Sequence, residues 1–261
     1  MRKNTSLLFC AAAFVFMLLP AASAGEEPLP WLRFSVDYWM SSIDAEAEYE
    51  GDRFSLDEDF SMSPRKDLPV FELGLDWSRT SGIFLSHVSP SYSGRDAIRR
   101  DISYGGVTFP AGTEVSYDLR MSFTDVLYRS SLAEFSGNRL DILFGVKIAD
   151  VSLELEGTDA HPGEQRTVKE DVRAPVPLVG LWFSGSLPHG FSYELQGRGL
   201  TLPVEGYRVD ILDANLMLNY EVHENFHAGA GYRAFLVKAD VDDFEFKSSL
   251  DGFVLRGLIR Y

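Results

Sequence analysis

Cysteine is nearly absent from this chain of 261 residues, whose one cysteine, Cys10, lies in the N-terminal segment. A disulfide needs two cysteines and a cysteine-based metal site needs several, so both are excluded. Basic residues are also scarce, with 24 Lys and Arg against 39 Asp and Glu and a formal net charge of −15. Nucleic-acid binding requires clustered Lys and Arg that neutralise phosphates, so the composition excludes a nucleic-acid partner.

Long apolar runs are missing as well. The longest extends from Leu7 to Leu19 and has 13 residues. A membrane-spanning helix needs about 20 apolar residues, so a helical membrane protein is excluded.

The N-terminal segment has the pattern of a cleaved signal peptide. Arg2 and Lys3 give it a positive start, and small residues at 22–24 follow the apolar run. We predict a signal peptide over residues 1–24 and a mature chain over residues 25–261. The signal peptide carries two basic and no acidic residues, so the mature net charge is −15 − 2 = −17.

Apolar and polar residues alternate with a period of two through most of the mature chain. Such a period places one residue class on each face of a β-strand. The segment 208–222 is a clear case, with apolar residues at every second position from Leu212 to Val222. Ten segments share the pattern: about 31–43, 69–78, 82–92, 113–129, 139–156, 174–187, 190–200, 208–222, 226–238 and 249–261.

The connections between these segments alternate in length, which is typical of an outer-membrane barrel. Short turns occur at 79–82, 134–138, 188–190 and 223–225. Longer, more charged connections occur at 44–68, 93–112, 157–173, 201–207 and 239–248. The sequence therefore predicts an all-β fold, a transmembrane antiparallel up-and-down β-barrel of about ten strands over residues 25–261. Eight or twelve strands stay open, because the first two long connections have room for another hairpin.

Aromatic residues near the ends of the apolar faces favour a membrane barrel over a soluble β-sandwich, which would also have alternating strands. We expect these residues in the two interfacial girdles: Trp31, Tyr38, Trp77, Tyr128, Trp182, Tyr220 and Tyr261.

One predicted strand changes phase. Its apolar residues occupy even positions from Leu140 to Ile148 and odd positions from Val151 to Leu155. A β-bulge at positions 149–150 would keep all of them on one outward face. We therefore predict a bulge at that point.

The closing segment, Gly252 to Tyr261, resembles the C-terminal recognition signal of outer-membrane barrels, with Tyr261 last and Ile259 two places before it. The stretches 140–147 and 228–235 are similar to uncharacterised small barrels of the OmpA and OmpW types. The resemblance implies a protein of the outer membrane of a Gram-negative bacterium, with an assembly signal at Ile259 and Tyr261. It also implies contact with periplasmic chaperones and the barrel-assembly machinery during export. It implies no activity.

The polar faces of the predicted strands carry equal numbers of both charges, which we expect to form a paired network inside the barrel. The cations are Arg33, Arg120, Arg139, Lys147, Arg198, Arg233, Arg256 and Arg260. The anions are Asp37, Glu72, Asp76, Asp118, Asp141, Glu194, Asp213 and Glu221. Such a network can be a structural plug or a gate, and the plug is favoured because small barrels have room mainly for their own side chains.

The excess acidity is then expected in the loops, mainly in 44–59 and 240–245. Clustered carboxylates attract divalent cations, which also bridge lipopolysaccharide phosphates. Weak divalent-cation binding at these loops stays open, because acidic loops also occur without a ligand. No EF-hand spacing is present, and no cofactor or specific metal site is expected.

Catalytic motifs are missing around the few residues that a rim hydrolase could use. These are Ser86, His87 and Ser89 in one segment and Asp159 and His161 in another. We therefore expect no enzyme.

The sequence favours an integral barrel with a structural, loop-display or weak-permeability role, in contact with outer-membrane lipid and lipopolysaccharide. A narrow channel or transporter for small ionic or hydrophobic solutes is the alternative. A rim hydrolase acting on lipid is less favoured than either.

Overall fold

The computed structural model describes residues 31–49, 52–56, 59, 63–158, 164–204, 207–241 and 244–261. The predicted signal peptide, 1–24, lies outside these residues. The elements in chain order are β1 (Trp31–Tyr49), β2 (Asp52–Ser55), β3 (Arg65–Asp76), β4 (Ser81–Val88), β5 (Ser91–Ala97), β6 (Ile102–Tyr104), β7 (Val107–Phe109), β8 (Glu114–Phe135), β9 (Asn138–Thr158), β10 (Gln165–Ser186), the 3₁₀ turn η1 (Pro188–Gly190), β11 (Phe191–Val204), β12 (Tyr207–His223), β13 (Phe226–Val241) and β14 (Phe244–Arg260). No helix in the described part of the chain is long and apolar enough to cross a membrane.

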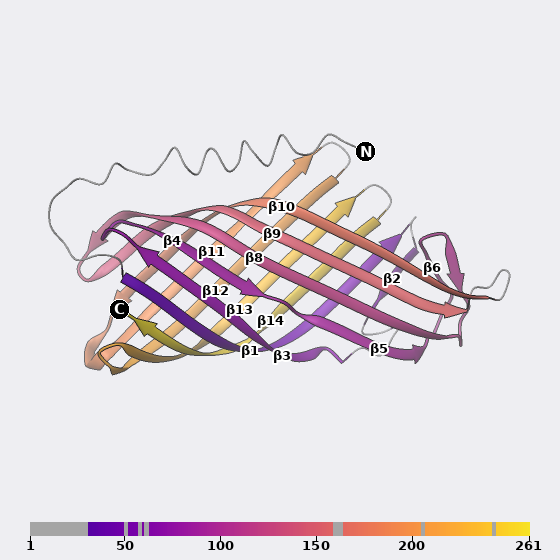
Figure 1. Cartoon of the computed structure of the whole chain (residues 1–261), viewed down its shortest axis with the longest axis horizontal. Helices are drawn as coiled ribbons and strands as arrows, with labels where there is room; N and C mark the ends of the chain where they lie inside the picture. Colours follow the sequence, from indigo (N-terminus) through magenta and orange to yellow (C-terminus); the bar gives the residue numbers. More distant parts are fainter. Residues whose placement is uncertain are drawn as a thin grey trace.

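Ten antiparallel strands form a closed barrel wall from the described residues (Figure 1). Their order around the wall is β1, β3, β4, β8, β9, β10, β11, β12, β13 and β14. The barrel closes between β14 and β1, where Tyr261 N donates to Leu32 O at 2.8 Å and Leu32 N donates to Tyr261 O at 3.0 Å. β5 continues β4 past Pro90 and pairs with β8. The predicted ten-stranded all-β barrel is confirmed.

The two long connections with room for a hairpin each contain one, but neither hairpin adds a strand to the wall. In the first, β1 continues to Tyr49 and β2 folds back against it. In the second, β6 and β7 form a separate two-stranded sheet.

Tight turns join the strands at the end of the barrel where the C-terminus lies beside the start of β1 (Figure 1). Between β8 and β9, Phe135 pairs with Asn138 across two residues with positive φ, Ser136 at 48° and Gly137 at 78°. Positive φ at both central positions is the geometry of a tight hairpin that matches strand twist. Short turns mark the periplasmic end of an outer-membrane barrel, so we call this end periplasmic and the opposite end extracellular.

An apolar band surrounds the periplasmic half of the wall. On β1, alternate outward residues from Leu32 to Met40 are exposed and apolar, and the outward positions become polar at Ser42. The same band continues on β14 from Phe253 to Ile259. It spans about 9–11 residues of each strand, which is the length that crosses a membrane.

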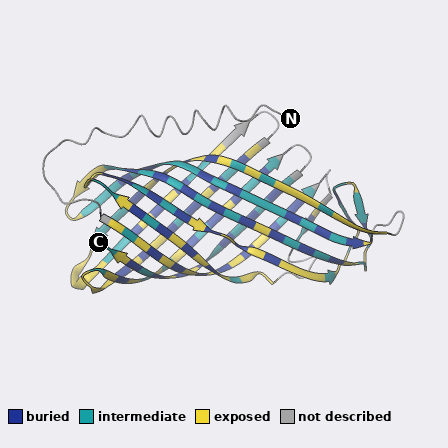
Figure 2. Cartoon of the chain, in the orientation of Figure 1, coloured by how far each residue is buried: buried dark blue, intermediate teal, exposed yellow. Residues whose placement is uncertain are grey.

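Buried and exposed residues alternate along the strands (Figure 2), and beyond this band the exposed ones are polar and the buried ones apolar. On β9 the outward residues become Asp150, Ser152 and Glu154, while Leu153 and Leu155 are buried inside. Because β9 has 21 residues, twice the crossing length, its extracellular half lies in water. Polar side chains then belong outside and apolar ones inside, as in a soluble protein.

The bulge predicted at positions 149–150 is wrong. β9 keeps an unbroken register there, with Ala149 opposite Phe123 and Asp150 opposite Ser122. The register shift between β8 and β9 lies instead at Ser131 and Ala133. The apolar residues change phase because the solvent outside the wall changes from lipid to water.

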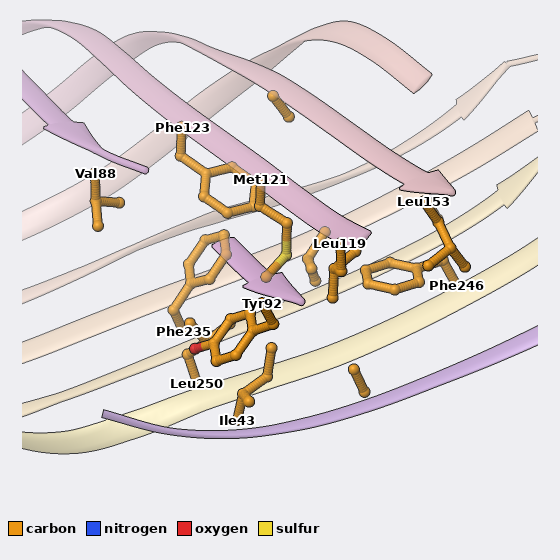
Figure 3. Packing of buried hydrophobic residues seen from close by; sticks show 14 of the residues in the cluster. Ile43, Val88, Tyr92, Leu119, Met121, Phe123, Leu153, Phe235, Phe246 and Leu250 are labelled. Atoms are coloured by element: carbon orange, nitrogen blue, oxygen red, sulfur yellow. The ribbon is translucent and has the colours of Figure 1, made fainter. Parts of the chain in front are cut away.

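The extracellular half is filled by an apolar core (Figure 3). Side chains from opposite walls meet in it, as with the rings of Phe123 and Phe235, whose centroids lie 4.7 Å apart. The β6–β7 hairpin also enters this core, where Ile102, Tyr104 and Phe109 are almost fully buried. We call this hairpin the lid, because it lies at the extracellular end of the barrel (Figure 1).

The aromatic girdle is partly as predicted. Trp77 and Tyr128 lie together near the periplasmic end, with ring centroids 5.9 Å apart, and Tyr220 is exposed there. The assignment of Trp182 to the girdle is wrong, because its side chain points inward and is 3% exposed. The side chain of Trp31 lies outside the described residues.

Candidate functional site

Charged side chains fill the periplasmic half of the barrel interior. They come from eight strands and alternate along each strand with residues of the apolar band. The buried ones are Asp37, Glu72, Asp125, Arg129, Asp141, Lys147, Glu194, Arg198, Asp213, Arg233 and Arg256. A buried charge is costly unless it is paired, so the contacts among these groups decide what the interior can do.

Asp213 on β12 is the centre of one group. Its Oδ2 accepts hydrogen bonds from Arg198 Nη2 at 3.0 Å and from Arg233 Nη2 at 2.8 Å. Lys147 Nζ lies 3.7 Å from the same oxygen and 2.7 Å from Asp125 Oδ1. Arg198 Nη2 also lies 3.3 Å from Asp125 Oδ2. We call these five residues the Asp213 cluster.

Arg256 on β14 is the centre of a second group. Its guanidinium donates to both oxygens of Asp37, at 2.7 and 2.6 Å, and to Glu72 Oε2 at 2.8 Å. It also donates to Glu194 Oε2 at 3.2 Å. Ser35 Oγ donates to Glu72 Oε2 at 3.2 Å. One cation therefore joins three carboxylates from β1, β3 and β11 across the interior.

Glu194 extends this second group toward the periplasmic rim. Its Oε1 accepts a hydrogen bond from Arg33 Nη2 at 2.8 Å and another from Arg260 Nη2 at 3.2 Å. With Arg256 this carboxylate has three arginine partners, while its own side chain is 4% exposed.

Arg129 belongs to a third group on the β3, β8 and β9 side. It lies 2.5 Å from Asp76 and 3.7 Å from Asp141, which also pairs with Arg139 at 2.6 Å. The three groups together reach from one wall of the barrel to the other.

Tryptophan rings pack against the arginines. The Trp182 ring lies 4.7 Å from Arg33 Cζ and 5.4 Å from Arg129 Cζ, and the Trp39 ring lies 5.2 Å from Arg233 Cζ. Such cation–π contacts contribute about 0.5–2 kcal/mol each, more when desolvated. Trp182 is therefore part of the interior packing and not of the membrane interface.

The structure places thirteen of the sixteen predicted network residues in the three ion-paired groups: Arg33, Asp37, Glu72, Asp76, Arg139, Asp141, Lys147, Glu194, Arg198, Asp213, Arg233, Arg256 and Arg260. Glu221 lies exposed near the periplasmic end of β12, outside them. Arg233 binds Asp213, while Arg256 binds other carboxylates.

Asp118 and Arg120 were predicted inside, and this is wrong. They form an ion pair with each other on the outer surface, where their side chains are 32% and 67% exposed. Both lie on the extracellular part of β8, where the wall faces water and polar residues point outward. Asp125 and Arg129 occupy odd-numbered positions of the same strand, and their side chains point into the interior instead. The apolar outward residues Val126 and Tyr128 beside them were the signal that could have identified them.

The described interior groups therefore hold eight cations and seven anions, a balance of 8 − 7 = +1. The predicted interior was neutral. The cations are Arg33, Arg129, Arg139, Lys147, Arg198, Arg233, Arg256 and Arg260; the anions are Asp37, Glu72, Asp76, Asp125, Asp141, Glu194 and Asp213.

Part of the excess acidity lies on strands and not in loops. Asp44, Glu46 and Glu48 are on the extracellular part of β1, which continues past the predicted end of that strand. Glu48 pairs with Arg53 at 2.9 Å. Over the residues whose placement is described, no three His, Cys, Asp or Glu side chains come close enough to hold a metal ion.

The apolar core of the extracellular half shifts the pKa of a tyrosine that is buried in it. Burial raises the pKa of Tyr92, which packs in that core beside Leu250 and Phe235 (Figure 3). An ion that crossed the barrel would have to pass this core and the lid as well as the charged groups.

No protein-family model matches the sequence, and no curated protein matches it either. Solved structures, in contrast, match the fold of the chain. The outer membrane protease OmpT of Escherichia coli superposes with a TM-score of 0.55 at 12% identity, over 88% of this chain and 97% of OmpT. The protein has the fold of an outer-membrane β-barrel. The match at this identity shows the fold alone, and together with the apolar band it agrees with the outer membrane of a Gram-negative bacterium as the location.

Two other outer-membrane proteins match less closely. The attachment invasion locus protein Ail of Yersinia pestis has a TM-score of 0.35 at 11% identity, covering 88% of this chain and 99% of Ail. The translocator domain of the autotransporter NalP of Neisseria meningitidis has a TM-score of 0.39 at 11% identity, covering 95% of this chain and 94% of that domain.

Proposed function

We propose that this barrel is a non-conducting membrane anchor that holds a rigid β-structure above the outer membrane. The observation that supports this most is the ion-paired interior of the periplasmic half. Its central charged side chains, from Asp213 to Arg256, are 1–5% exposed and share partners across the barrel. Side chains held in this way leave no row of free charges along which an ion could move.

The extracellular half supports a role in display. β8, β9 and β10 have 22, 21 and 22 residues and run together to one end of the molecule (Figure 1). Their outward residues beyond the membrane are polar, and an apolar core fixes them from inside. A surface built in this way is presented to the exterior on a stiff support.

The same geometry favours a role without catalysis. Ser86 and His87 are neighbours on β4, so their side chains lie on opposite faces of the wall: Ser86 is 4% exposed, while His87 is exposed and hydrogen-bonds Thr124 at 2.9 Å. They cannot form a nucleophile and base pair, which requires direct contact. Ser89, the third candidate in this segment, donates its hydroxyl to Met121 O at 3.2 Å. The other predicted candidates, Asp159 and His161, lie outside the described residues.

The proposed partners follow from the surface. The apolar band would contact outer-membrane lipid, and the polar outward residues just beyond it would contact lipopolysaccharide. Ile259 on β14 and Tyr261 just after it are both exposed, and they would be the assembly signal read by the barrel-assembly machinery. The acidic outward residues of β1 are the proposed place of weak divalent-cation binding.

A paired measurement on Arg256→Ala and Arg233→Ala tests the proposal against a gated channel. For each variant, conductance in planar bilayers is recorded beside heat-modifiable gel migration, which reports whether the barrel is folded. If the network is a plug, each variant loses fold stability and gains no lasting channel. A variant that stays folded and conducts steadily would identify the network as a gate and the protein as a narrow channel.

A further inference from the structure

One pair of neighbouring strands in the wall separates before reaching the extracellular end. β10 pairs with β9 along its whole length, from Gln165 to Gly185. With β11 it pairs only from Ser186 up to Val179, which lies opposite Gly199. Above that point β11 continues in register with β12 but not with β10. Among the described residues, β10 from 165 to 178 therefore has a ladder on one side only. We call the gap above Val179 and Gly199 the β10–β11 seam.

The seam begins inside the apolar band. Val179, Pro177 and Pro175 are exposed outward residues of β10, and the first outward charge above them is Arg173. On the neighbouring strand, Ile148 stands opposite Pro175 and belongs to the same band. An unpaired strand edge in hydrocarbon is costly, because its N–H and C=O groups find no water. The start of this seam needs a physical explanation.

Pro175 and Pro177 explain why β10 can be unpaired inside the apolar band. Proline has no N–H and is found in strands where the missing donor faces away from a ladder. Alternate residues of a strand direct their backbone groups to the same side, so Pro175 and Pro177 face one neighbour. The β9 ladder runs through both without a register shift, so their donor-free side faces the seam. The β10 edge of the seam therefore has no N–H to satisfy over the part that meets lipid, and only the carbonyls of Pro175 and Pro177 remain unpaired there.

The side chains behind the seam are apolar. Behind the seam, Leu178 points inward and is 1% exposed, and Leu200 is half-buried opposite Ile211 of β12. A molecule in the seam would meet hydrocarbon on the membrane side and apolar side chains on the interior side.

We propose that the β10–β11 seam is a lateral binding site for an acyl chain of an outer-leaflet lipid, which reaches Leu178 and Leu200 between the two unpaired strand edges. An acyl chain needs no hydrogen bonds, and so it fits an edge from which two prolines have removed the donors. A peptide strand is the other candidate occupant. It would require alternating donors and acceptors along the edge, which Pro175 and Pro177 interrupt.

Photolabelling tests the site directly. The purified full mature protein is reconstituted into vesicles of a phospholipid that carries a diazirine in its acyl chain, and labelled residues are mapped after irradiation. Outward residues such as Leu236 face lipid, so they should be labelled whether or not an acyl chain enters the seam. The proposal expects label on Leu178 and Leu200 as well. Val237 is the matched control, because it points inward in the same cross-strand row as Leu200 and Ile211 but lies between two intact ladders. It should stay unlabelled.

Closing the seam should remove the interior label. Continuing the observed register by two residues would bring position 177 opposite position 201, and the mature sequence has no other cysteine. In Pro177→Cys/Thr201→Cys, a disulfide can form only if the two strands come together. The oxidised form should lose the label at Leu178 and Leu200 and keep it at Leu236, and reduction should restore it. Pro175→Val/Pro177→Val, which returns two donors to the edge, should lower the interior label without a crosslink.

Two results would overturn the proposal. In the first, Leu178 and Leu200 are labelled no more than Val237, so no acyl chain enters. In the second, a benzophenone side chain placed at Pro177 crosslinks to a polypeptide and not to lipid, which would assign the seam to a protein strand.

Discussion

Replacing Asp213 with asparagine is the most informative perturbation of the charged interior. The change keeps the size of the side chain and removes one negative charge. Asp213 is the carboxylate shared by Arg198, Arg233 and Lys147, at 3.0, 2.8 and 3.7 Å. Asp213→Asn leaves these three cations with Asp125 as their remaining carboxylate in the cluster.

The structure sets the size of the effect. The side chain of Asp213 is 1% exposed and those of its partners are 2–3% exposed, so water cannot replace the lost charge without opening the barrel. Removing one partner of a buried ion pair costs about 3–5 kcal/mol. We expect Asp213→Asn to lower the free energy of unfolding by about that amount. Adding Lys147→Met should recover part of the loss, because it removes one of the three cations that are left with a single carboxylate.

The assay is urea unfolding in lipid vesicles, followed by tryptophan fluorescence and by heat-modifiable migration. Asp118→Asn is the matched control, since Asp118 forms an exposed pair on the outside of β8, and it should leave the unfolding midpoint unchanged. If Asp213→Asn unfolds at the same urea concentration as the unmodified protein, the interior is hydrated and the argument from buried pairing fails.

Three further predictions test other parts of the structure. Leu216→Arg on the apolar band, where Leu216 is 53% exposed, should cost about 2–4 kcal/mol in lipid, and folding indifferent to it would count against that band. On the extracellular part of β9, Leu153→Asn should destabilise the barrel strongly while Ser152→Asn should not, measured by the same urea assay; equal effects would contradict the reversed polarity. Deleting 252–261 removes the lipid-facing half of β14 and should abolish outer-membrane assembly, whereas Tyr261→Ala should only slow it. Both effects are measured as the amount of folded protein per unit of time. A normal yield of the truncated form would exclude closure of the barrel through β14.

Strand number and most interior charges could be predicted because both depend on local alternation. The network residues of β9, β11, β13 and β14, such as Lys147 and Arg256, lie among apolar residues of the membrane band. In this band apolar residues face outward, so a charged residue that alternates with them along the strand must face inward.

The same rule fails where the strands leave the membrane. It placed Asp118 and Arg120 inside and required a bulge in β9, because the sequence does not state where lipid ends and water begins. The pairing of Asp125 with Lys147, and the separation of β10 from β11, depend on contacts between segments far apart in the chain. Alternation along a single strand carries no information about them.

Planar-bilayer conductance tests the central claim, closure of the interior, most directly. It is measured on the unmodified protein and on a variant in which residues 99–112, which include the lid, are replaced by a short turn between Ile98 and Thr113. These two residues are already joined by a hydrogen bond of 3.0 Å, from Ile98 N to Thr113 O. Because the apolar core and the ion-paired groups lie below the lid, both proteins should show no stable channel. A large and steady conductance from the unmodified protein would contradict closure of the interior altogether, and one from the lidless variant alone would show that the lid closes the barrel and the charged groups do not.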